Sequence, residues 1–401
     1  MKESDDGRRV TLVLTTGSHV LGTLAPFAVA APWWSEVASV VHAARVVHGV
    51  DVTVLRLLVG RPSHTDRPAM GGEVVYLAQV DVPPQSLRPW TGTLPVDAAR
   101  ATWARPGGPA ADLRWATRVL AGQGRTALGP AVQTRSWSLS SIWRLPSATG
   151  DVWLKVVPQA QAHEGRVLDM LRGQAVPSVV ASDGSGRMLL EHVPGTNQYG
   201  ARSSSLFEMV TLLVGIQALY VSATDGLLAA GVPDWRRDAF VRRIEAVLPS
   251  ALQRVTASGR RCLDRLVDGL GQRYLDLEAC GLPDTIVHGD LHPGNFRADA
   301  GSLVLLDWVD CAVGHPLLDV AAFLDAVPIR WCSVLRRFWA NQWSNRVSEA
   351  DADRAISLVE PLAALRRAVV YLGFLGSFEP AEHCYFDRDA TRWLERAAQL
   401  A

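Results

Sequence analysis

Short, largely apolar segments early in the chain predict β-strands. These segments cover residues 10–17, 50–59 and 73–82, and each is rich in Val and Leu with Gly at or near its end. Residues 35–47, between the first two segments, have the apolar spacing of a helix. The pattern therefore predicts a small α/β domain over residues 1–85.

A change of composition follows this first domain. Residues 83–108 contain many Pro and Gly residues and are typical of a linker. The apolar spacing of residues 109–120 then predicts a single helix. We therefore assign residues 86–124 to a linker with one helix.

From residue 204 onward the apolar period is mostly that of helices. Leu206, Met209 and Leu213 share one predicted helix face, and the residues of three later segments repeat at similar spacing. These later predicted helices are 240–252, 316–345 and 351–377. The second of them carries Trp331, Trp339 and Trp343, which could stack a planar or sugar-like acceptor, although helix packing is the commoner role of such residues.

Residues 286–310 interrupt the helical pattern with two short apolar strands that each lead to a carboxylate. The first strand leads into His-Gly-Asp-Leu-His-Pro-Gly-Asn, which contains Asp290 and Asn295, and the apolar run 303–306 leads to Asp307. The Pro-Gly pair predicts a turn that brings Asn295 back beside Asp290. A carboxylate for the acceptor proton and oxygen ligands for Mg²⁺ are what phosphoryl transfer requires. We therefore predict that Asp290 is the catalytic base and that Asn295 and Asp307 are the metal ligands.

Three other interpretations of this motif compete with this one. A surface turn would explain one Asp or one Asn, but it does not explain two apolar strands that each end in a carboxylate. A metal site formed by His288, Asp290 and His292 is disfavoured because the following Pro-Gly pair interrupts an extended strand. A scaffold that binds nucleotide without catalysis stays open, because a motif alone does not prove turnover.

Lysine is rare in this chain. Of the 40 basic residues, only Lys2 and Lys155 are lysine, and the others are arginine. A compact ammonium group fits a narrow phosphate-binding cleft that the wide guanidinium group does not, so Lys155 is a candidate phosphate anchor. Glu164 follows on a predicted helix face with Val167 and Leu168, where a carboxylate needs a cationic partner. Lys155 is the candidate partner; a solvated Glu at a helix start is the alternative.

In this order, Lys155, Glu164, the Asp290–Asn295 motif and Asp307 resemble the aminoglycoside phosphotransferase and choline kinase family. The resemblance covers about residues 125–401. It implies an α+β, bilobal, protein-kinase-like fold, with a small β-rich N-lobe at 125–192 and a large helical C-lobe at 193–401 that holds the acceptor site. The small α/β domain precedes this fold.

The same resemblance implies the roles of the cofactor-binding residues. The segment 188–195 resembles the inter-lobe hinge, whose backbone would bind adenine, and Asp319 resembles a structural aspartate. Residues 136–143 replace the usual Gly-rich loop, so their serine hydroxyls and backbone amides would line the phosphates. The implied cofactor-binding set is Lys155, Glu164, Ser138, Ser140, Glu191 and Val193.

Composition narrows the class of protein. The formal net charge is zero and 48% of the residues are hydrophobic, which offers no electrostatic case for binding nucleic acid or a membrane. The charged start of the chain lacks the apolar core of a signal peptide, and the apolar run 20–34 is broken by two Pro residues. Five scattered Cys residues are typical of buried thiols in a reducing cytoplasm. We therefore predict a cytoplasmic protein.

Two further features bear on substrate and on the first domain. The late acidic residues Glu379, Glu382, Asp387 and Asp389 could attract a cationic acceptor, but a solvated helix start is the favoured interpretation. The segment 46–49 at the end of the first predicted helix weakly resembles a degenerate Nudix-type module, although two Val residues stand where the acidic pair would bind metal. A cap or dimerisation domain without activity is the alternative.

Taken together, the sequence predicts an ATP- and Mg²⁺-dependent phosphotransferase that moves the γ-phosphoryl group to a hydroxyl of a small molecule. A sugar, an amino-alcohol or an antibiotic-like compound would each suit as acceptor. A kinase of peptide or protein hydroxyls and a non-catalytic nucleotide-binding regulatory module are the alternatives. The acceptor, the choice between ATP and GTP, and the oligomeric state are left open by the sequence.

Overall fold

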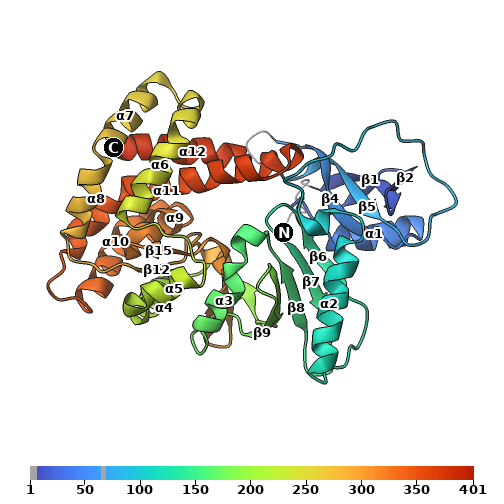
Figure 1. Ribbon diagram of the computed structural model, residues 1–401, viewed down its shortest axis with the longest axis horizontal. Coiled ribbons are helices and arrows are strands. Elements are labelled where there is room, and N and C mark those ends of the chain that lie inside the picture. Colours follow the sequence, from blue (N-terminus) through green and yellow to red (C-terminus); the bar gives the residue numbers. More distant parts are fainter. Residues whose placement is uncertain (1–6, 65–68) are drawn as a thin grey trace. The chain divides into compact units, whose positions relative to one another are not determined.

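A computed structural model describes residues 7–64 and 69–401, which form two compact units (Figure 1). The first unit contains Met1–Ala162, Val179–His192 and Phe374–Arg388, and the second contains His163–Ser178, Val193–Gly373 and Asp389–Ala401. The chain passes from the first unit to the second between His192 and Val193, within the segment predicted to be the hinge. Residues 1–6, part of the charged chain start, lie outside the described residues.

A mixed β-sheet with one helix forms the N-terminal part of the first unit. Its elements are β1 (Arg8–Thr16), β2 (His19–Thr23), β3 (Phe27–Val29), α1 (Ala38–His48), β4 (Thr53–Arg61) and β5 (Gly72–Gln79). The strand order is β2-β1-β5-β4, with β3 also paired to β1, and β1 runs parallel to β5. Helix α1 ends at Gly49, whose left-handed φ of 66° closes the helix through a hydrogen bond to Arg45 O. The three strands and the helix predicted here are confirmed.

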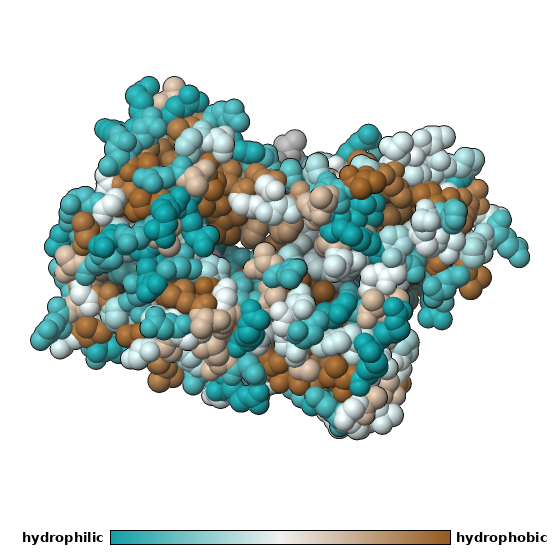
Figure 2. All heavy atoms as spheres, viewed as in Figure 1, coloured by the Kyte–Doolittle hydropathy of each residue, from teal (hydrophilic) through white to brown (hydrophobic). Residues whose placement is uncertain are grey.

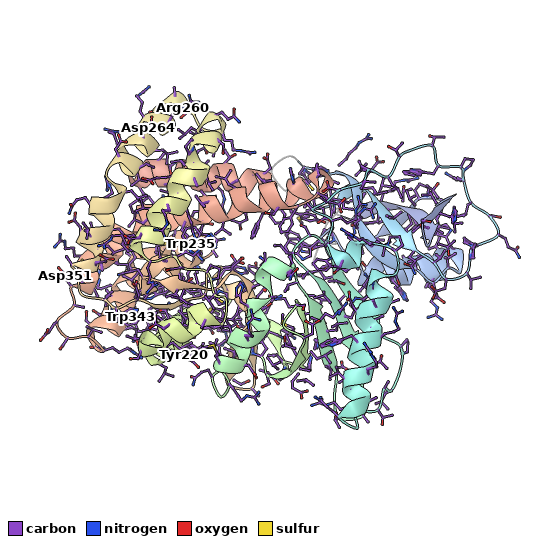
Figure 3. The ribbon with its side chains drawn as sticks, in the orientation of Figure 1. Tyr220, Trp235, Arg260, Asp264, Trp343 and Asp351 are labelled. Carbon is purple, nitrogen blue, oxygen red and sulfur yellow. The ribbon has the colours of Figure 1, made fainter. Side chains whose placement is uncertain are left out.

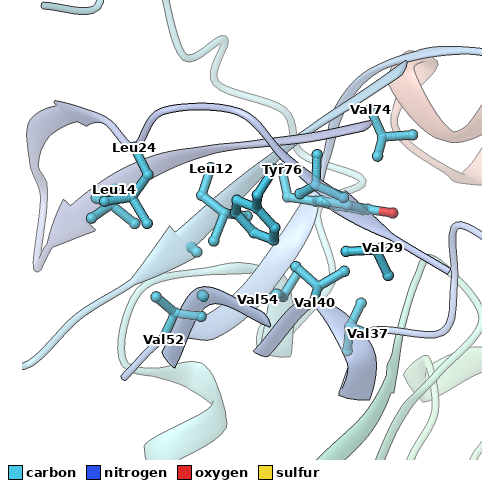
Figure 4. Close-up of a cluster of buried hydrophobic side chains, with 14 of the residues drawn as sticks. Leu12, Leu14, Leu24, Val29, Val37, Val40, Val52, Val54, Val74 and Tyr76 are labelled. Atoms are coloured by element: carbon cyan, nitrogen blue, oxygen red, sulfur yellow. The ribbon is translucent and has the colours of Figure 1, made fainter. Parts of the chain in front are cut away.

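The core of this sheet is built from aliphatic side chains on alternate strand positions (Figure 4). Leu12 and Leu14 on β1 and Tyr76 on β5 are buried against Val40 of α1. Full burial of one such side chain stabilises the fold by about 1.5–3 kcal/mol. Arg8, which is also buried, donates from Nη1 to the Tyr76 hydroxyl at 2.8 Å.

A second, antiparallel sheet completes the first unit. Its strands are β6 (Val132–Ser136), β7 (Ser141–Leu145), β8 (Val152–Val156), β9 (Val179–Ser182) and β10 (Arg187–Glu191). They follow the order β6-β7-β8-β10-β9, and helix α2 (Gly108–Gly122) packs on them through Ala116 and Leu120. The helix predicted at 109–120 is confirmed. The predicted linker also contains the short 3-10 helix η1 (Thr102–Ala104), whose Trp103 is buried in this core.

The two sheets of the first unit are joined by side-chain hydrogen bonds. The Gln133 amide accepts from Val54 N at 2.9 Å and donates to Val54 O at 2.7 Å. The Ser136 hydroxyl donates to Leu55 O at 3.0 Å. The early sheet therefore packs directly on the sheet that carries Lys155.

The second unit is mainly helical and contains two small antiparallel sheets. Its helices are α3 (His163–Met170), α4 (Ser203–Leu219), α5 (Thr224–Ala229), α6 (Arg237–Ala251), α7 (Ala257–Asp268), α8 (Leu270–Glu278), α9 (Val320–Asp325), α10 (Ile329–Ser344), α11 (Ala352–Ser377) and α12 (Asp387–Leu400). Its strands are β11 (Thr196–Asn197), β12 (Thr285–Val287), β13 (Phe296–Asp299), β14 (Ser302–Leu305) and β15 (Ala312–Gly314). The last residues of α11 and the first two of α12 belong to the first unit.

Short 3-10 helices connect many of these elements. They are η2 (Gln159–Gln161), η3 (Val221–Ala223), η4 (Leu252–Arg254), η5 (Pro293–Asn295), η6 (Trp308–Asp310), η7 (Pro316–Asp319) and η8 (Pro380–Tyr385). Strand β11 pairs with β13 and β13 with β14, while β12 pairs with β15. The two apolar strands predicted around residues 286–310 correspond to β12 and β14.

The aromatic stripe of α10 serves packing. Trp339 and Trp343 are buried, and Trp331 is half-buried (Figure 3 labels Trp343). Trp235, just before α6, is also buried. The packing interpretation is therefore confirmed for Trp339 and Trp343, because a buried indole cannot also stack an acceptor.

On the face drawn in Figure 2, hydrophilic and hydrophobic residues are intermixed. Within the described residues, no single helix has the length and apolar composition to cross a membrane, and only α4 with Val221–Ala229, bent by 47°, meets these requirements as a pair. All five cysteines are free; Cys280 and Cys311 are buried, but Cys262, Cys332 and Cys384 are half-buried, which corrects the expectation that all were buried.

Candidate active site

The loop that carries Asp290 begins directly after β12 and depends on a glycine. Gly289 has a left-handed φ of 88°. A Cβ atom at this position would lie 2.0 Å from Asp310 O and 3.0 Å from Arg366 Nη2. Only glycine satisfies both requirements, so the His-Gly-Asp sequence is a structural condition for placing Asp290.

The Asp319 carboxylate holds the backbone of this loop through hydrogen bonds. Its Oδ2 accepts the backbone N–H of His288 at 2.9 Å, and its Oδ1 accepts that of Gly289 at 2.7 Å. The Gln217 side chain donates to the same carboxylate at 3.2 Å. Burial raises the pKa of Asp319, while His288 and the two backbone amides oppose that shift. Asp319 therefore positions the loop, in the structural role that the family resemblance implies.

His288 links the Asp290 loop to the segment before Asp307. Its Nδ1 accepts the backbone N–H of Asp290 at 3.3 Å, so its Nε2 is the nitrogen that donates to Leu306 O at 2.8 Å. The ring is fully buried and makes an edge contact with Trp308. Burial lowers the pKa of His288, which keeps the ring neutral. A neutral, buried His288 is suited to a structural link and cannot bind a metal through the same nitrogens.

Asn295 lies beside Asp290 as the Pro-Gly turn predicted. Its Nδ2 donates to Asp290 O at 2.9 Å and lies 3.5 Å from Asp290 Oδ2. The backbone carbonyl of Asn295 accepts the backbone N–H of Leu306, the residue before Asp307, at 2.7 Å. Because the Nδ2 group is used by Asp290, the Oδ1 atom is the part of the amide that remains to bind a cation.

Asp307 follows β14 in an unusual backbone conformation. Its φ of 62° and ψ of 64° place a non-glycine residue in the left-handed region, at the start of η6. Such strain is found most often at functional sites, where the surrounding structure holds it. Before it, Leu305 is the one buried residue of the apolar run 303–306.

Negative charge accumulates between these loops. Burial, together with the carboxylates of Asp290 and Asp307, raises the pKa of Asp310 to about 7. A divalent cation would relieve this charge, so the donor set fits Mg²⁺. Within the described residues, no group of three His, Cys, Asp or Glu side chains could hold a metal by itself. Mg²⁺ does not require one, because it is commonly held by one or two protein ligands with substrate phosphates and waters.

Two consecutive arginines of α11, which the sequence analysis did not single out, contact the same loops. Arg366 donates to Gly289 O at 3.2 Å and to Asp310 O at 3.1 Å. Arg367 donates to Gly289 O at 3.1 Å and to Asp290 Oδ1 at 3.0 Å. Burial alone would raise the pKa of Asp290, but Arg367 and then His292 outweigh it and hold that pKa well below its usual range. The signal in the sequence was two adjacent charges within the otherwise apolar stretch 361–370.

Lys155 and Glu164 lie in different units. Lys155 is buried on β8, where its strand neighbours are Ile142 and Met188. Glu164 is buried on α3 with Val167 and Leu168, as the predicted helix face requires. Their pairing stays a prediction.

Ser138 and Ser140 occupy the turn between β6 and β7, but both are buried. The backbone N–H of Ser138 donates to Glu382 Oε2 at 2.5 Å, and the Ser140 hydroxyl accepts from Trp137 Nε1 at 3.0 Å. The Ser138 amide is therefore already used, whereas the Ser140 hydroxyl can still donate a hydrogen bond. A role of the two serines in lining the phosphates stays a prediction.

The predicted hinge residues lie at the boundary between the units. Glu191 ends β10, and Arg125 binds its carboxylate with two nitrogens, one of them at 3.0 Å. Val193 is half-buried and begins the next segment of the second unit. A role of either backbone in binding adenine stays a prediction.

The late acidic residues fall into two groups. Asp387 and Asp389 stand in the first turn of α12, and Asp387 is exposed, as a solvated helix start predicts. Glu379 binds Arg100 at 2.8 Å, and Glu382 is buried and accepts the Ser138 amide. Asp389 binds Arg392 at 3.1 Å. A solvated helix start was therefore the wrong interpretation for Glu379, which lies just before η8, and for Glu382, which lies within it. Both residues hold parts of the first unit together.

The chain is similar to one protein family and to several solved structures. The model of the phosphotransferase enzyme family (APH) matches residues 134–356, more than half of the chain. A structure from Ralstonia eutropha JMP134, provisionally described as an aminoglycoside phosphotransferase, aligns at 18% identity with a TM-score of 0.50 over 73% of this chain and 97% of its own. The macrolide 2'-phosphotransferase of Brachybacterium faecium aligns at 18% identity and a TM-score of 0.49 over 68% and 95%. A choline/ethanolamine kinase family protein of Mesorhizobium loti aligns at 16% identity and a TM-score of 0.47 over 72% and 94%.

No curated protein matches this chain. The family match and the Ralstonia structure confirm the α+β kinase-like fold, which here follows an extra N-terminal β-rich region. The Nudix-type resemblance of residues 1–85 is not supported, because the family model begins at Thr134 and the structural relatives are phosphotransferases. The chain belongs to the phosphotransferase enzyme family whose members include aminoglycoside and choline kinase-like enzymes.

Proposed function

We propose that this phosphotransferase moves the γ-phosphoryl group of ATP to a hydroxyl of a small molecule, such as a sugar, an amino-alcohol or an antibiotic-like compound. Enzymes of this family use a nucleoside triphosphate and a divalent metal and act on small molecules. The observation that supports the proposal most strongly is the arrangement of Asp290, Asn295 and Asp307. Buried hydrogen bonds through His288 and Leu306 hold these three residues on adjoining loops.

Each of these residues has a distinct proposed role. Asp290 accepts the proton of the acceptor hydroxyl while that oxygen bonds to phosphorus. Its carboxylate is partly exposed, at 28%, so an acceptor can reach it. Asn295 and Asp307 hold Mg²⁺, which when bound neutralises charge on the phosphate oxygens.

Four further residues supply the proposed nucleotide contacts. Lys155 binds the α- and β-phosphates as a compact cation, and Glu164 orients it. The backbone near Glu191 and Val193 hydrogen-bonds adenine. The Ser138 amide already donates to Glu382, whereas the Ser140 hydroxyl accepts from Trp137 Nε1 and can still donate to a phosphate oxygen.

The test is a transfer assay with Mg²⁺, ATP or GTP, and a pool of sugars, amino-alcohols and hydroxylated antibiotics, followed by mass spectrometry of phosphorylated products. Asp290→Asn should lower turnover by about 10²–10⁴-fold, because it removes the group that accepts the proton. Nucleotide binding, measured by thermal shift, should persist. Asp299→Asn, at an exposed carboxylate at the end of β13, is the matched control and should keep full turnover.

Normal turnover by Asp290→Asn would refute the role of the base. Nucleotide binding without transfer to any acceptor would favour a non-catalytic nucleotide-binding module. Transfer to added peptides alone would favour a kinase of protein hydroxyls.

A further inference from the structure

The proposed base is paired with a buried cation. Arg367 Nη2 lies 3.0 Å from Asp290 Oδ1 and also donates to the Tyr371 hydroxyl at 3.2 Å. The side chain of Arg367 is only 9% exposed, whereas that of Asp290 is 28% exposed. An acceptor that reaches Asp290 therefore meets a carboxylate whose Oδ1 atom is already bound to the guanidinium group of Arg367.

The guanidinium group of Arg367 is held in place from several sides. Its carbon lies 5.0 Å from the ring centre of Trp393 and 5.5 Å from that of Tyr371. Its Nη1 donates to Gly289 O at 3.1 Å. The neighbouring Arg366 packs over Trp235, 5.0 Å from its ring centre, and fixes the same turn of α11. Because the cation cannot turn away, the Arg367–Asp290 pair presents no net charge to the acceptor.

The late acidic residues predicted as a possible attraction for a cationic acceptor are mostly engaged by other protein groups. Glu379 binds Arg100 and lies 3.9 Å from Arg56, and Glu382 accepts the Ser138 amide. Asp389 is paired with Arg392. Three of the four carboxylates that could have attracted a polycation therefore have partners within their own units.

We infer that Arg367 is a specificity-determining residue that selects acceptors without an ammonium group beside the reacting hydroxyl. This inference rests on the proposed function and narrows its acceptor class to neutral hydroxyl compounds. An acceptor hydroxyl must come within about 3 Å of Asp290 to lose its proton, which brings its neighbouring groups close to Arg367. An uncompensated carboxylate would attract an ammonium group there, whereas Arg367 cancels that attraction. An ammonium group beside the reacting hydroxyl would then lose water without gaining a counter-charge, which a neutral group does not.

The experiment compares acceptors that differ only in one charge. Pairs such as glucose and glucosamine, or N-acetylated and free amino sugars and amino-alcohols, are assayed with the full-length protein, Mg²⁺ and ATP. The wild-type protein should favour the neutral member of each phosphorylated pair by about 10-fold or more in kcat/KM, mainly through KM, since an ammonium group that loses water without a counter-charge is disfavoured.

Variants at residue 367 then test the cause. Arg367→Met and Arg367→Gln remove the charge and should reduce the preference to about 3-fold or less, with the ammonium compound gaining. Arg367→Lys keeps the charge and should keep the preference. Arg336→Met removes an arginine of α10 that binds Glu360, and it should change nothing. Thermal unfolding identifies folded variants, and the Gln and Lys variants provide the comparison if the Met variant does not fold.

The possible outcomes separate this inference from the proposed function. Turnover by Asp290→Asn equal to that of the wild type, or no transfer to any acceptor, overturns the proposed function and this inference with it. Loss of turnover in Asp290→Asn, with equal or better use of ammonium compounds by the wild type, overturns the inference alone. An unchanged preference in both uncharged variants also overturns it.

Discussion

Replacing Gly289 with alanine tests the packing that places the proposed base. The new Cβ would lie 2.0 Å from Asp310 O, and the backbone φ of 88° is one that side-chain-bearing residues rarely adopt. Gly301 provides a matched control, because its φ of 91° is nearly the same but no atom lies within 4 Å of an added Cβ. The two variants therefore differ in the steric conflict and share the backbone strain.

The magnitude follows from the contacts that must move. Left-handed backbone costs an alanine about 1–2 kcal/mol, and the lower entropy of its unfolded chain offsets about 0.4–1 kcal/mol of this. Gly301→Ala should therefore lose about 1 kcal/mol. To relieve the clash, Gly289 must also leave Asp319 Oδ1, at 2.7 Å, and the guanidinium groups of Arg366 and Arg367, at 3.2 and 3.1 Å. Hydrogen bonds to charged groups contribute about 1.5–3 kcal/mol each, so Gly289→Ala should lose at least about 3 kcal/mol more than the control.

Thermal unfolding and the transfer assay measure both consequences. A loss of 1 kcal/mol lowers the Tm of a domain of this size by about 2–4 °C, so Gly289→Ala should unfold about 10 °C below Gly301→Ala. A displacement of about 1 Å at a reacting group can cost about 10²-fold in rate, so turnover should fall in Gly289→Ala and persist in Gly301→Ala. Equal Tm values and equal turnover for the two variants would refute the steric argument.

Three further substitutions test other parts of the structure. Burial raises the pKa of Glu382 from 4.5 to about 7, so Glu382 ionises at lower pH in the unfolded chain than in the folded protein, and the free energy of unfolding should fall by up to about 3 kcal/mol as pH rises from 4.5 to 7. Glu382→Gln should flatten this dependence of Tm on pH, whereas a Gln substitution of the exposed Glu395 should not. Parallel profiles of Tm against pH for the Glu382 variant and the wild type would contradict the assignment. Asp307→Asn should abolish the Mg²⁺-dependent part of the thermal shift produced by ATP, whereas Asp299→Asn should keep it; an unchanged shift would exclude Asp307 as a ligand. Asp319→Asn should cost about 2–4 kcal/mol in chemical denaturation, because its amide group would face a backbone N–H; a loss below 0.5 kcal/mol would show that the loop does not depend on it.

The sequence predicted much of the fold because its signals are local. The strands β1, β4 and β5 and the helices α1 and α2 follow from apolar spacing and from glycines at their ends. The Pro-Gly turn predicted that Asn295 returns to Asp290, and the observed hydrogen bond joins residues only five positions apart. The family resemblance extended this to the kinase-like fold, which the family match confirms.

Predictions about nonlocal partners were less successful. Ser138 and Ser140 are polar residues in a turn, and composition favours their exposure. The Ser138 amide donates to Glu382, 244 residues later in the chain. The same contact explains why Glu382 is not part of a solvated helix start.

The sequence by itself determined which residue types can perform phosphoryl transfer and in which local turns they stand. Only the tertiary structure decided their charge environment. Arg367 reaches Asp290 from 77 residues away, and no periodicity or turn rule connects those positions. The physical reason is that spacing along the chain governs backbone conformation, whereas the field at a carboxylate depends on every charge packed near it in space.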